Sequence, residues 1–198
     1  MSVLEDQLTA EGVALPQPGT YVFDQAHTTV DFVGKHIFTK VRGRFTEFDG
    51  RIEIGQRPQD SRVEATIQAA SLETHTEQRD DHLRSPDFLN VEQYPEIRFV
   101  STGLRHTGGA SFELDGELTI KDITHPVTLA GEYGGSAVNP YGKVAASFSA
   151  STAIEREDWD MTWNMALEAG GWLVGKSVTI EVEVEALRED SASDTEDS

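Results

Sequence analysis

The chain has 198 residues, which fits one domain with tails, and its 37% hydrophobic content is enough for a core. Its formal net charge of −19, from 35 acidic and 16 basic residues, disfavours binding to nucleic acid and to anionic membrane surfaces. The absence of cysteine excludes disulfides and thiolate chemistry. The sequence shows no secretory signal and no apolar run of membrane-spanning length, so we expect a cytoplasmic protein that is not integral to a membrane.

Three regions are expected along the chain. Residues 1–18 are polar, with a few apolar residues at helical spacing before two prolines. They predict a frayed tail or a short helix, or alternatively a flap over the body. Residues 19–188 form the folded body. Residues 189–198 are acidic and polar throughout, which predicts a disordered tail.

The body shows a hydrophobic period of two, which is typical of half-buried strands. Alternating segments begin near Tyr21, Val30, Val41, Arg62, Ile97, Phe112, Val127, Val144 and Val178. The segment from Val41 to Ile54 carries Phe45 and Phe48 at odd spacing, which indicates a bulge. Tight turns join these segments, and no alternation of strands with helices is present. The pattern therefore predicts an all-β fold, either a sandwich or a closed antiparallel barrel.

One helical insertion, around residues 74–90, interrupts the strands. Thr74 and Glu77 have the spacing of a capping box, and Ser85 before Pro86 predicts a second short turn. The insertion has few apolar residues, so we expect a cap that packs by one thin face. Its Arg, Asp and His residues are expected to anchor this cap to the body.

Small residues recur on the predicted inner face of the strands, among them Gly34, Ala65, Gly116, Gly131 and Ala146. They leave room inside, and a barrel of about eight strands can hold one small ligand. Alternatively, they meet bulky partners across a filled core. The alternation of residues does not choose between these two outcomes.

Several motifs resemble the YceI-like family. They are Tyr21-Val-Phe-Asp24-x-x-His27, Arg79-Asp-x-His-Leu-x-Ser85, Tyr94-Pro-x-Ile-x-Phe99 and Gly116-x-Leu-Thr-Ile-Lys121, within a resemblance that covers about residues 20–187. The resemblance implies an extended antiparallel eight-stranded lipocalin-like β-barrel. It also implies a long apolar ligand inside, such as a polyisoprenoid or a quinone- or fatty-acid-like chain. Homodimers occur in the family, so a homodimer is a further expectation. No cofactor is expected besides the bound lipid.

Candidate ligand-binding residues follow from strand parity and from the irregular segment before the last strand. The strand candidates are Phe32, His36, Phe45, Phe99, Phe112, Leu114, Leu118, Val144 and Phe148. The segment adds Met161, Trp163 and Trp172, whose adaptable side chains suit a mobile gate or, alternatively, a minor core under a loop. For each strand candidate, ordinary core packing is the competing interpretation.

The histidines are more simply explained as structural than as metal ligands. His27 and His36 lie nine residues apart, and His75 and His82 have a spacing that would place them on one helix face. Neither pair has the spacing of a zinc motif and no third ligand is fixed, so no metal site is expected.

An enzyme is the rival functional class. Glu155, Glu157, Asp158 and Asp160 crowd one segment, where one carboxyl group with a raised pKa would serve as a general acid. A solvated acidic loop is the simpler interpretation, and no nucleophile elbow, phosphate loop or dinucleotide fingerprint is present. We therefore expect no catalytic residue. The predicted function is binding, sequestration or transport of a long apolar lipid; the alternative is an enzyme acting on an isoprenoid-type substrate.

Overall fold

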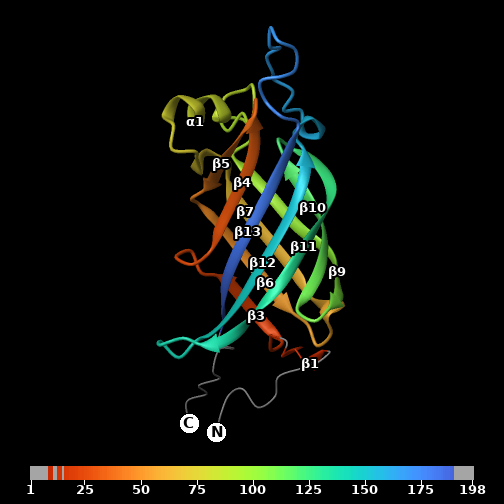
Figure 1. Ribbon diagram of the computed structural model, residues 1–198. Helices are drawn as coiled ribbons and strands as arrows, with labels where there is room; N and C mark the ends of the chain where they lie inside the picture. The colour runs from red at the N-terminus through yellow and green to blue at the C-terminus, as the bar shows by residue number, and fades with distance from the viewer. Residues whose placement is uncertain (1–8, 11–12, 15, 190–198) are drawn as a thin grey trace, which may run out of the picture.

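A computed structural model describes residues 9–10, 13–14 and 16–189 (Figure 1). The strands are β1 (Thr9–Ala10), β2 (Val13–Ala14), β3 (Gly19–Phe23), β4 (Thr29–His36), β5 (Thr39–Phe45), β6 (Phe48–Ile54), β7 (Arg62–Gln68), β8 (Leu72–Glu73), β9 (Glu96–Gly108), β10 (Ser111–Ile120), β11 (Ile123–Val138), β12 (Val144–Glu155) and β13 (Ser177–Arg188). One α-helix, α1 (Glu77–Arg84), and three short 3-10 turns, η1 (Pro58–Asp60), η2 (Ala69–Ser71) and η3 (Arg156–Trp159), complete the described elements.

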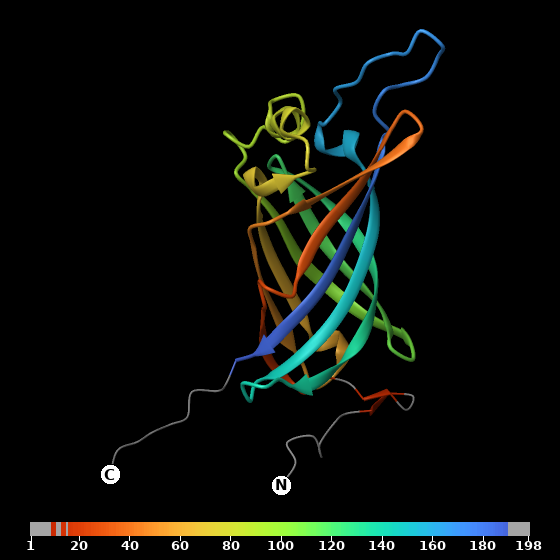
Figure 2. The ribbon, with the colours of Figure 1, turned by 60° about the vertical axis from the view of Figure 1, so that its left-hand side comes forward.

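The strands close into one antiparallel barrel (Figures 1 and 2). From β9 to β13 each strand pairs with the next along the chain. β13 then pairs with both β3 and β4, which follow one another along the same side of it. The pairs β3/β4, β5/β6 and β7/β8 therefore each act as one interrupted strand. With the five long strands they make eight positions in up-and-down order, which confirms the predicted eight-stranded barrel.

The predicted single segment from Val41 to Ile54 is divided into β5 and β6 at Thr46 and Glu47. These two residues leave the regular pairing and bond instead to the neighbouring interruption. The Thr46 N–H donates to the Ser71 carbonyl, and the Glu47 carbonyl accepts from the Gln68 N–H at 2.9 Å. The expected bulge is thus a break of two residues that coincides with a break in the next strand, and it lets the long strands bend around the barrel.

Several inward glycines meet bulky side chains, which is one of the two outcomes that the sequence left open, whereas Gly34 has open space beside it. Phe32 lies directly opposite Gly43, and Phe112 lies directly opposite Gly131, across neighbouring strands. The edge of each aromatic ring occupies the space beside its glycine: a Cβ added at Gly131 would stand 2.4 Å from Phe112 Cζ. Glycine here allows a large ring to lie against the barrel wall rather than across the interior. Small and bulky residues are therefore paired, and a cavity still remains.

The helical insertion covers the upper end of the barrel (Figure 2). The predicted capping box is wrong: α1 begins at Glu77 after Thr76, which makes no side-chain cap. Thr74 serves another purpose, because its N–H donates to Asp80 Oδ1 at 2.8 Å, and its hydroxyl donates to the same oxygen. Arg79 Nε donates to Thr74 Oγ1 at 2.7 Å. As expected, these charged residues fasten the cap to the end of β8.

The cap packs by the thin apolar face that the sequence predicts. Phe88 and Leu89 are buried in one core cluster with Leu72, Trp159 and Met161. A second buried cluster at the lower end of the barrel joins Tyr21, Ile52, Tyr133, Ala146 and Ala186.

The predicted N-terminal segment is described only in part. β1 and β2 pair as a small antiparallel hairpin below the barrel (Figure 1). Residues 16–18 are fixed to the lower end, because Arg188 Nη2 donates to the Pro18 carbonyl at 2.9 Å and the Tyr21 hydroxyl donates to the Gln17 carbonyl at 2.9 Å. Of the segment 1–18, which was expected to be a frayed tail or a short helix, residues 1–8, 11–12 and 15 lie outside the described residues. The predicted acidic tail 189–198 also lies outside them apart from Glu189, whose N–H donates to the Thr20 carbonyl at 2.8 Å.

Candidate functional site: a long apolar cavity

The barrel encloses one large cavity of about 700 Å³. Its wall extends from Pro16 at the lower end to Arg79 and His82 of α1 at the upper end. Most of the side chains between them are aliphatic or aromatic, as the alternation along each strand predicts. A volume of this size lies within the range that holds small-molecule ligands. The shape and lining fit an extended apolar chain.

Ten of the twelve predicted ligand-binding residues line this cavity. They are Phe32, His36, Phe45, Phe99, Phe112, Leu114, Leu118, Phe148, Met161 and Trp163. Phe112 and Phe148 are neighbours, with ring centroids 6.5 Å apart. Phe32 and Phe45 contact each other with centroids 5.6 Å apart. Contact of these side chains with a ligand stays a prediction.

Two predicted residues, Val144 and Trp172, do not line the cavity. Val144 packs against the lower core cluster, because it stands at the start of β12 below the open interior. Trp172 is 59% exposed and lies on the segment that joins η3 to β13. Val144 has the inward parity of β12, but parity does not give the height of a residue along the barrel. Trp172 lies on the segment before the last strand, and its sequence does not give the path of that segment.

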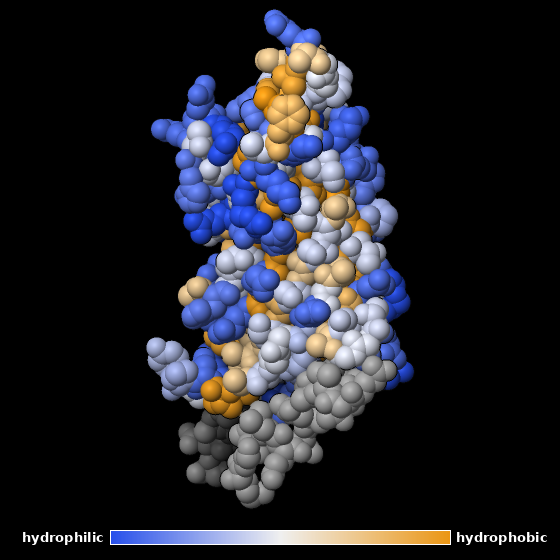
Figure 3. Space-filling view, viewed as in Figure 1, coloured by the Kyte–Doolittle hydropathy of each residue, from blue (hydrophilic) through white to orange (hydrophobic). Residues whose placement is uncertain are grey.

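The segment from Asn164 to Val174 forms a hairpin arm, not an irregular loop. Leu173 N–H donates to the Met165 carbonyl at 2.9 Å, and Ala166 and Trp172 form a bridge. The arm pairs with the β4–β5 turn, where the Ile37 N–H donates to the Leu173 carbonyl at 2.9 Å. Figure 3 shows hydrophobic residues gathered at this upper end. Leu173 and Val174 also line the cavity, so the arm forms part of its mouth.

The residues before the arm belong to the core and to the cavity wall. Trp159 and Met161 are buried in the upper core cluster. Trp163 lines the cavity and packs edge-on against His82 with ring centroids 4.5 Å apart. Phe88 completes this aromatic group, 5.1 Å from His82 between centroids. Met161 also lines the cavity, so this part of the segment belongs to the core and to the cavity wall at once.

Arg156 is a functional candidate that the sequence analysis missed. It is 2% exposed, lines the upper part of the cavity, and lies 5.9 Å from the Phe88 ring centroid. Burial lowers the pKa of its guanidinium, although an arginine remains protonated in proteins. Leaving a charged donor buried without an acceptor costs about 1–3 kcal/mol or more. Parity along β12 would have found it, because Arg156 follows Thr152 and Ile154 on the inward face.

The charge of the cavity wall differs from that of the whole chain. Among the described lining residues, three are cationic, namely Lys35, Arg79 and Arg156, and one is acidic, namely Asp31. Asp31 Oδ2 lies 4.0 Å from Arg42 Nη1. Lys35 is exposed and shares the outward face of β4 with Asp31, so the cationic groups that reach the interior at its upper end are Arg79 and Arg156.

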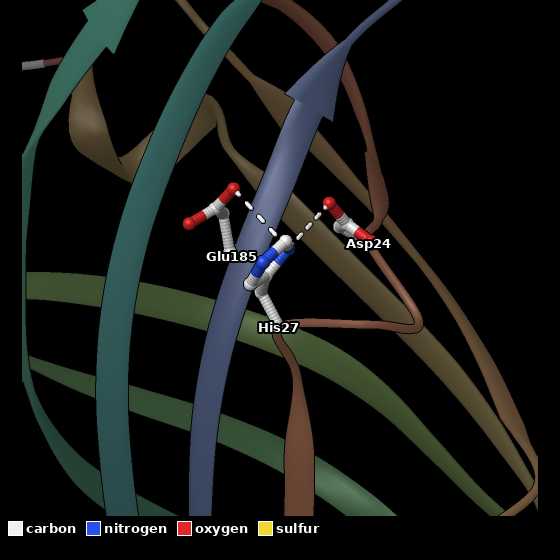
Figure 4. A group of neighbouring side chains, drawn as sticks. All are labelled: Asp24, His27 and Glu185. Atoms are coloured by element: carbon white, nitrogen blue, oxygen red, sulfur yellow. Dashed lines mark hydrogen bonds and ion pairs between the residues drawn. The ribbon is translucent and has the colours of Figure 1, made fainter. Parts of the chain in front are cut away.

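A group of charged side chains lies outside the cavity, where the β3–β4 interruption meets β13 (Figure 4). His27 Nδ1 lies 2.9 Å from Asp24 Oδ2 and 3.8 Å from Glu185 Oε1. The hydrogen bond with Asp24 raises the pKa of His27 and lowers that of Asp24. One possible ligand atom from each of Asp24, His27 and Glu185 lies within 4.8 Å of the other two, close enough for the three residues to share a metal ion. Sequence reasoning paired His27 with His36 instead, because Glu185 comes from the last strand.

The other histidines are mostly structural. His106 Nε2 and His125 Nε2 bond backbone carbonyls of Gly109 and Asp158, at 2.8 and 2.9 Å. The predicted shared helix face of His75 and His82 is wrong. His75 precedes α1, has a positive φ of 61°, and lies 3.0 Å from a Glu73 oxygen.

The acidic segment of the enzyme alternative faces outward. Glu157 pairs with Lys176 at 2.9 Å, and Asp160 pairs with Lys121 at 3.6 Å. Glu155 and Asp158 are exposed. None of these four carboxylates lines the cavity. A general acid at this segment would therefore not contact a substrate held in the barrel.

Comparison with known proteins agrees with this architecture. The YceI-like domain matches residues 21–186. A UPF0312 protein of Staphylococcus epidermidis is 36% identical over 166 residues, covering 82% of this chain and 94% of that protein. A UPF0312 protein of Ectopseudomonas mendocina is 31% identical over 163 residues, covering 81% and 82%.

Several solved structures share the fold. The YCEI protein of Campylobacter jejuni is 26% identical with a TM-score of 0.68, covering 79% of this chain and 90% of that one. BcnA of Burkholderia cenocepacia is 21% identical with a TM-score of 0.72, covering 82% and 98%. A polyisoprenoid binding domain from Saccharophagus degradans is 9% identical with a TM-score of 0.61, covering 87% and 100%. With its matched domain, relatives and eight-stranded barrel, the chain belongs to the YceI-like family.

Proposed function

We propose that this protein binds a long apolar lipid inside its barrel and sequesters or transports it. The observation that carries this proposal is the cavity of about 700 Å³ inside the barrel, whose wall is predominantly apolar. Burial of an alkyl or isoprenoid chain contributes about 0.8 kcal/mol per methylene group, so such a chain binds tightly without many polar contacts. The Saccharophagus degradans domain of the same fold is described as polyisoprenoid binding, which supports this ligand class.

A binding role is better supported than catalysis. The carboxylates proposed for general acid catalysis point away from the cavity, and two of them are held in ion pairs. The arm beside the β4–β5 turn and the α1 cap lie at the upper end, where a ligand would enter. Among the described residues no helix has the length and hydropathy to span a membrane.

The proposal is tested with a tryptophan reporter at Phe112. This side chain faces the cavity, so in Phe112→Trp we expect the added fluorescence to change when a polyisoprenol is titrated. The matched control is Val100→Trp, because Val100 is 45% exposed and does not line the cavity. A folded Phe112→Trp protein whose fluorescence responds no more than the control would contradict ligand entry. Consumption of the polyisoprenol during the titration would favour the enzyme alternative.

A further inference from the structure

The upper part of the cavity contains a cation that the apolar walls do not explain. Arg156 follows Thr152 and Ile154 on the inward side of β12, at the point where the strand passes into η3. Its backbone position is fixed, because its N–H donates to the Lys176 carbonyl at 2.9 Å. The side chain is therefore directed into the barrel end that α1 covers.

Two of the three guanidinium nitrogens have protein acceptors. Nε donates to the Gly175 carbonyl at 2.9 Å, and Nη1 donates to the Met161 carbonyl. Nη2 is buried and has no hydrogen-bond partner among the residues that the structure describes. The neighbouring Glu157 carboxylate is paired with Lys176 instead. A buried arginine nitrogen with two free N–H groups is thus available to an acceptor that enters from the cavity.

The surroundings favour an anionic acceptor over a neutral one. Arg79 also lines the upper end of the cavity, and the one acidic lining residue, Asp31, lies near Arg42. Low polarity around Arg156 strengthens a charge-assisted hydrogen bond and removes the competition from water.

We infer that Arg156 binds the anionic head group, a carboxylate or a phosphate monoester, of a lipid whose tail occupies the barrel. This inference rests on the proposed function, because the tail supplies most of the buried surface. Nη2 is covered in the present arrangement, so the head group reaches it when the adjacent Phe88 ring turns aside. His82 and Trp163, which contact that ring, then border the head group.

The test compares ligands that share a tail and differ in the head group. Palmitic acid, hexadecyl phosphate and hexadecanol are titrated into the protein at mildly alkaline pH by isothermal titration calorimetry. We expect at least one of the two anionic lipids to bind at least about tenfold more tightly than the alcohol. The preference between the anions distinguishes carboxylate from phosphate.

The variant Arg156→Gln should lose this preference while it still binds the alcohol. The matched control is Arg42→Gln, an arginine at the same end of the barrel that does not line the cavity; its preference should be unchanged. Because Arg156 also holds two backbone carbonyls, Arg156→Lys is the second variant: it keeps the charge and should keep part of the preference.

Equal binding of the anions and the alcohol by the wild-type protein would overturn the head-group inference and leave the proposed function standing. A preference that survives in folded Arg156→Gln would overturn the assignment to Arg156. If none of the three lipids binds, both the inference and the proposed function fail.

Discussion

The close approach of the Phe32 ring to Gly43 gives a direct test of how the cavity is kept open. In Gly43→Ala, the new Cβ would stand 2.3 Å from Phe32 Cζ and 2.8 Å from Thr74 Cγ2. Ordinary van der Waals contact begins near 3.4 Å, so the ring edge must move by at least about 1 Å. Because Phe32 lines the cavity, we expect its ring to move into that space.

The expected cost combines two opposing effects. Overpacking a core position costs about 1–3 kcal/mol, whereas replacing glycine by alanine within a strand recovers about 0.5–1 kcal/mol. The net loss in the free energy of unfolding then lies between about 0 and 2.5 kcal/mol and is centred on about 1 kcal/mol, which corresponds to roughly 2–4 °C in Tm for a domain of this size. Affinity for a long apolar chain should fall as well, since the displaced ring occupies part of its path.

Thermal unfolding followed by circular dichroism measures the first effect, and calorimetric titration with a polyisoprenol measures the second. Gly103→Ala is the control, because a Cβ at Gly103 on β9 meets no atom within 4 Å. This control should keep its affinity and should keep or slightly gain stability. If Gly43→Ala binds and unfolds like Gly103→Ala, the idea that glycine holds the ring against the wall is refuted.

Two further predictions concern the cap and the external charged group. Asp80→Asn weakens a buried acceptor of two hydrogen bonds, so it should lower the free energy of unfolding, measured in urea, by about 1–3 kcal/mol. The control Asp81→Asn alters an exposed carboxylate and should change the free energy of unfolding by less than about 0.5 kcal/mol. Equal losses in the two variants would contradict the anchoring role of Asp80. The raised pKa of His27 should appear above 6.5 in an NMR titration and fall toward 6.5 in Asp24→Asn, with a smaller fall in Glu185→Gln.

The sign of the pH dependence follows from these two shifts. A raised His27 pKa contributes stability below about pH 6.5 that is lost as the pH rises through the raised value. A lowered Asp24 pKa contributes stability above pH 3.8 that is lost as the pH falls through the lowered value. The stability that the Asp24–His27 pair contributes should therefore be largest between about pH 3.8 and pH 6.5, and the variant Asp24→Asn should lack it.

Strand parity made the barrel and most of its lining predictable. Side chains two residues apart share a face, so Phe112, Leu114 and Leu118 were assigned together and all line the cavity. The same rule explains why Arg156 was overlooked. Alternation along β12 was followed only as far as Ala150, and the acidic residues around Arg156 made the segment resemble a solvated loop. Continuing the alternation from Ala150 by three further steps of two residues each places Arg156 on the inward face.

Other features depend on contacts between distant segments, and local patterns do not encode them. The arm from Asn164 to Val174 is set by pairing with the β4–β5 turn, so Trp172 was assigned to the cavity although it lies outside. Thr74 and Glu77 have capping-box spacing, but Thr74 is used by Asp80 instead. Whether the inner glycines left a void or were covered depended on ring positions that alternation does not fix.

The central claim, that the barrel holds a long apolar lipid, is tested most directly by the protein as it is purified from cells. Extraction with organic solvent, followed by mass spectrometry, should release one class of long-chain lipid in about equimolar amount. The Arg156 inference adds that this lipid carries a carboxylate or a phosphate. Repeated extracts without a stoichiometric apolar compound, together with an experimental structure whose barrel is filled by its own side chains, would contradict the account.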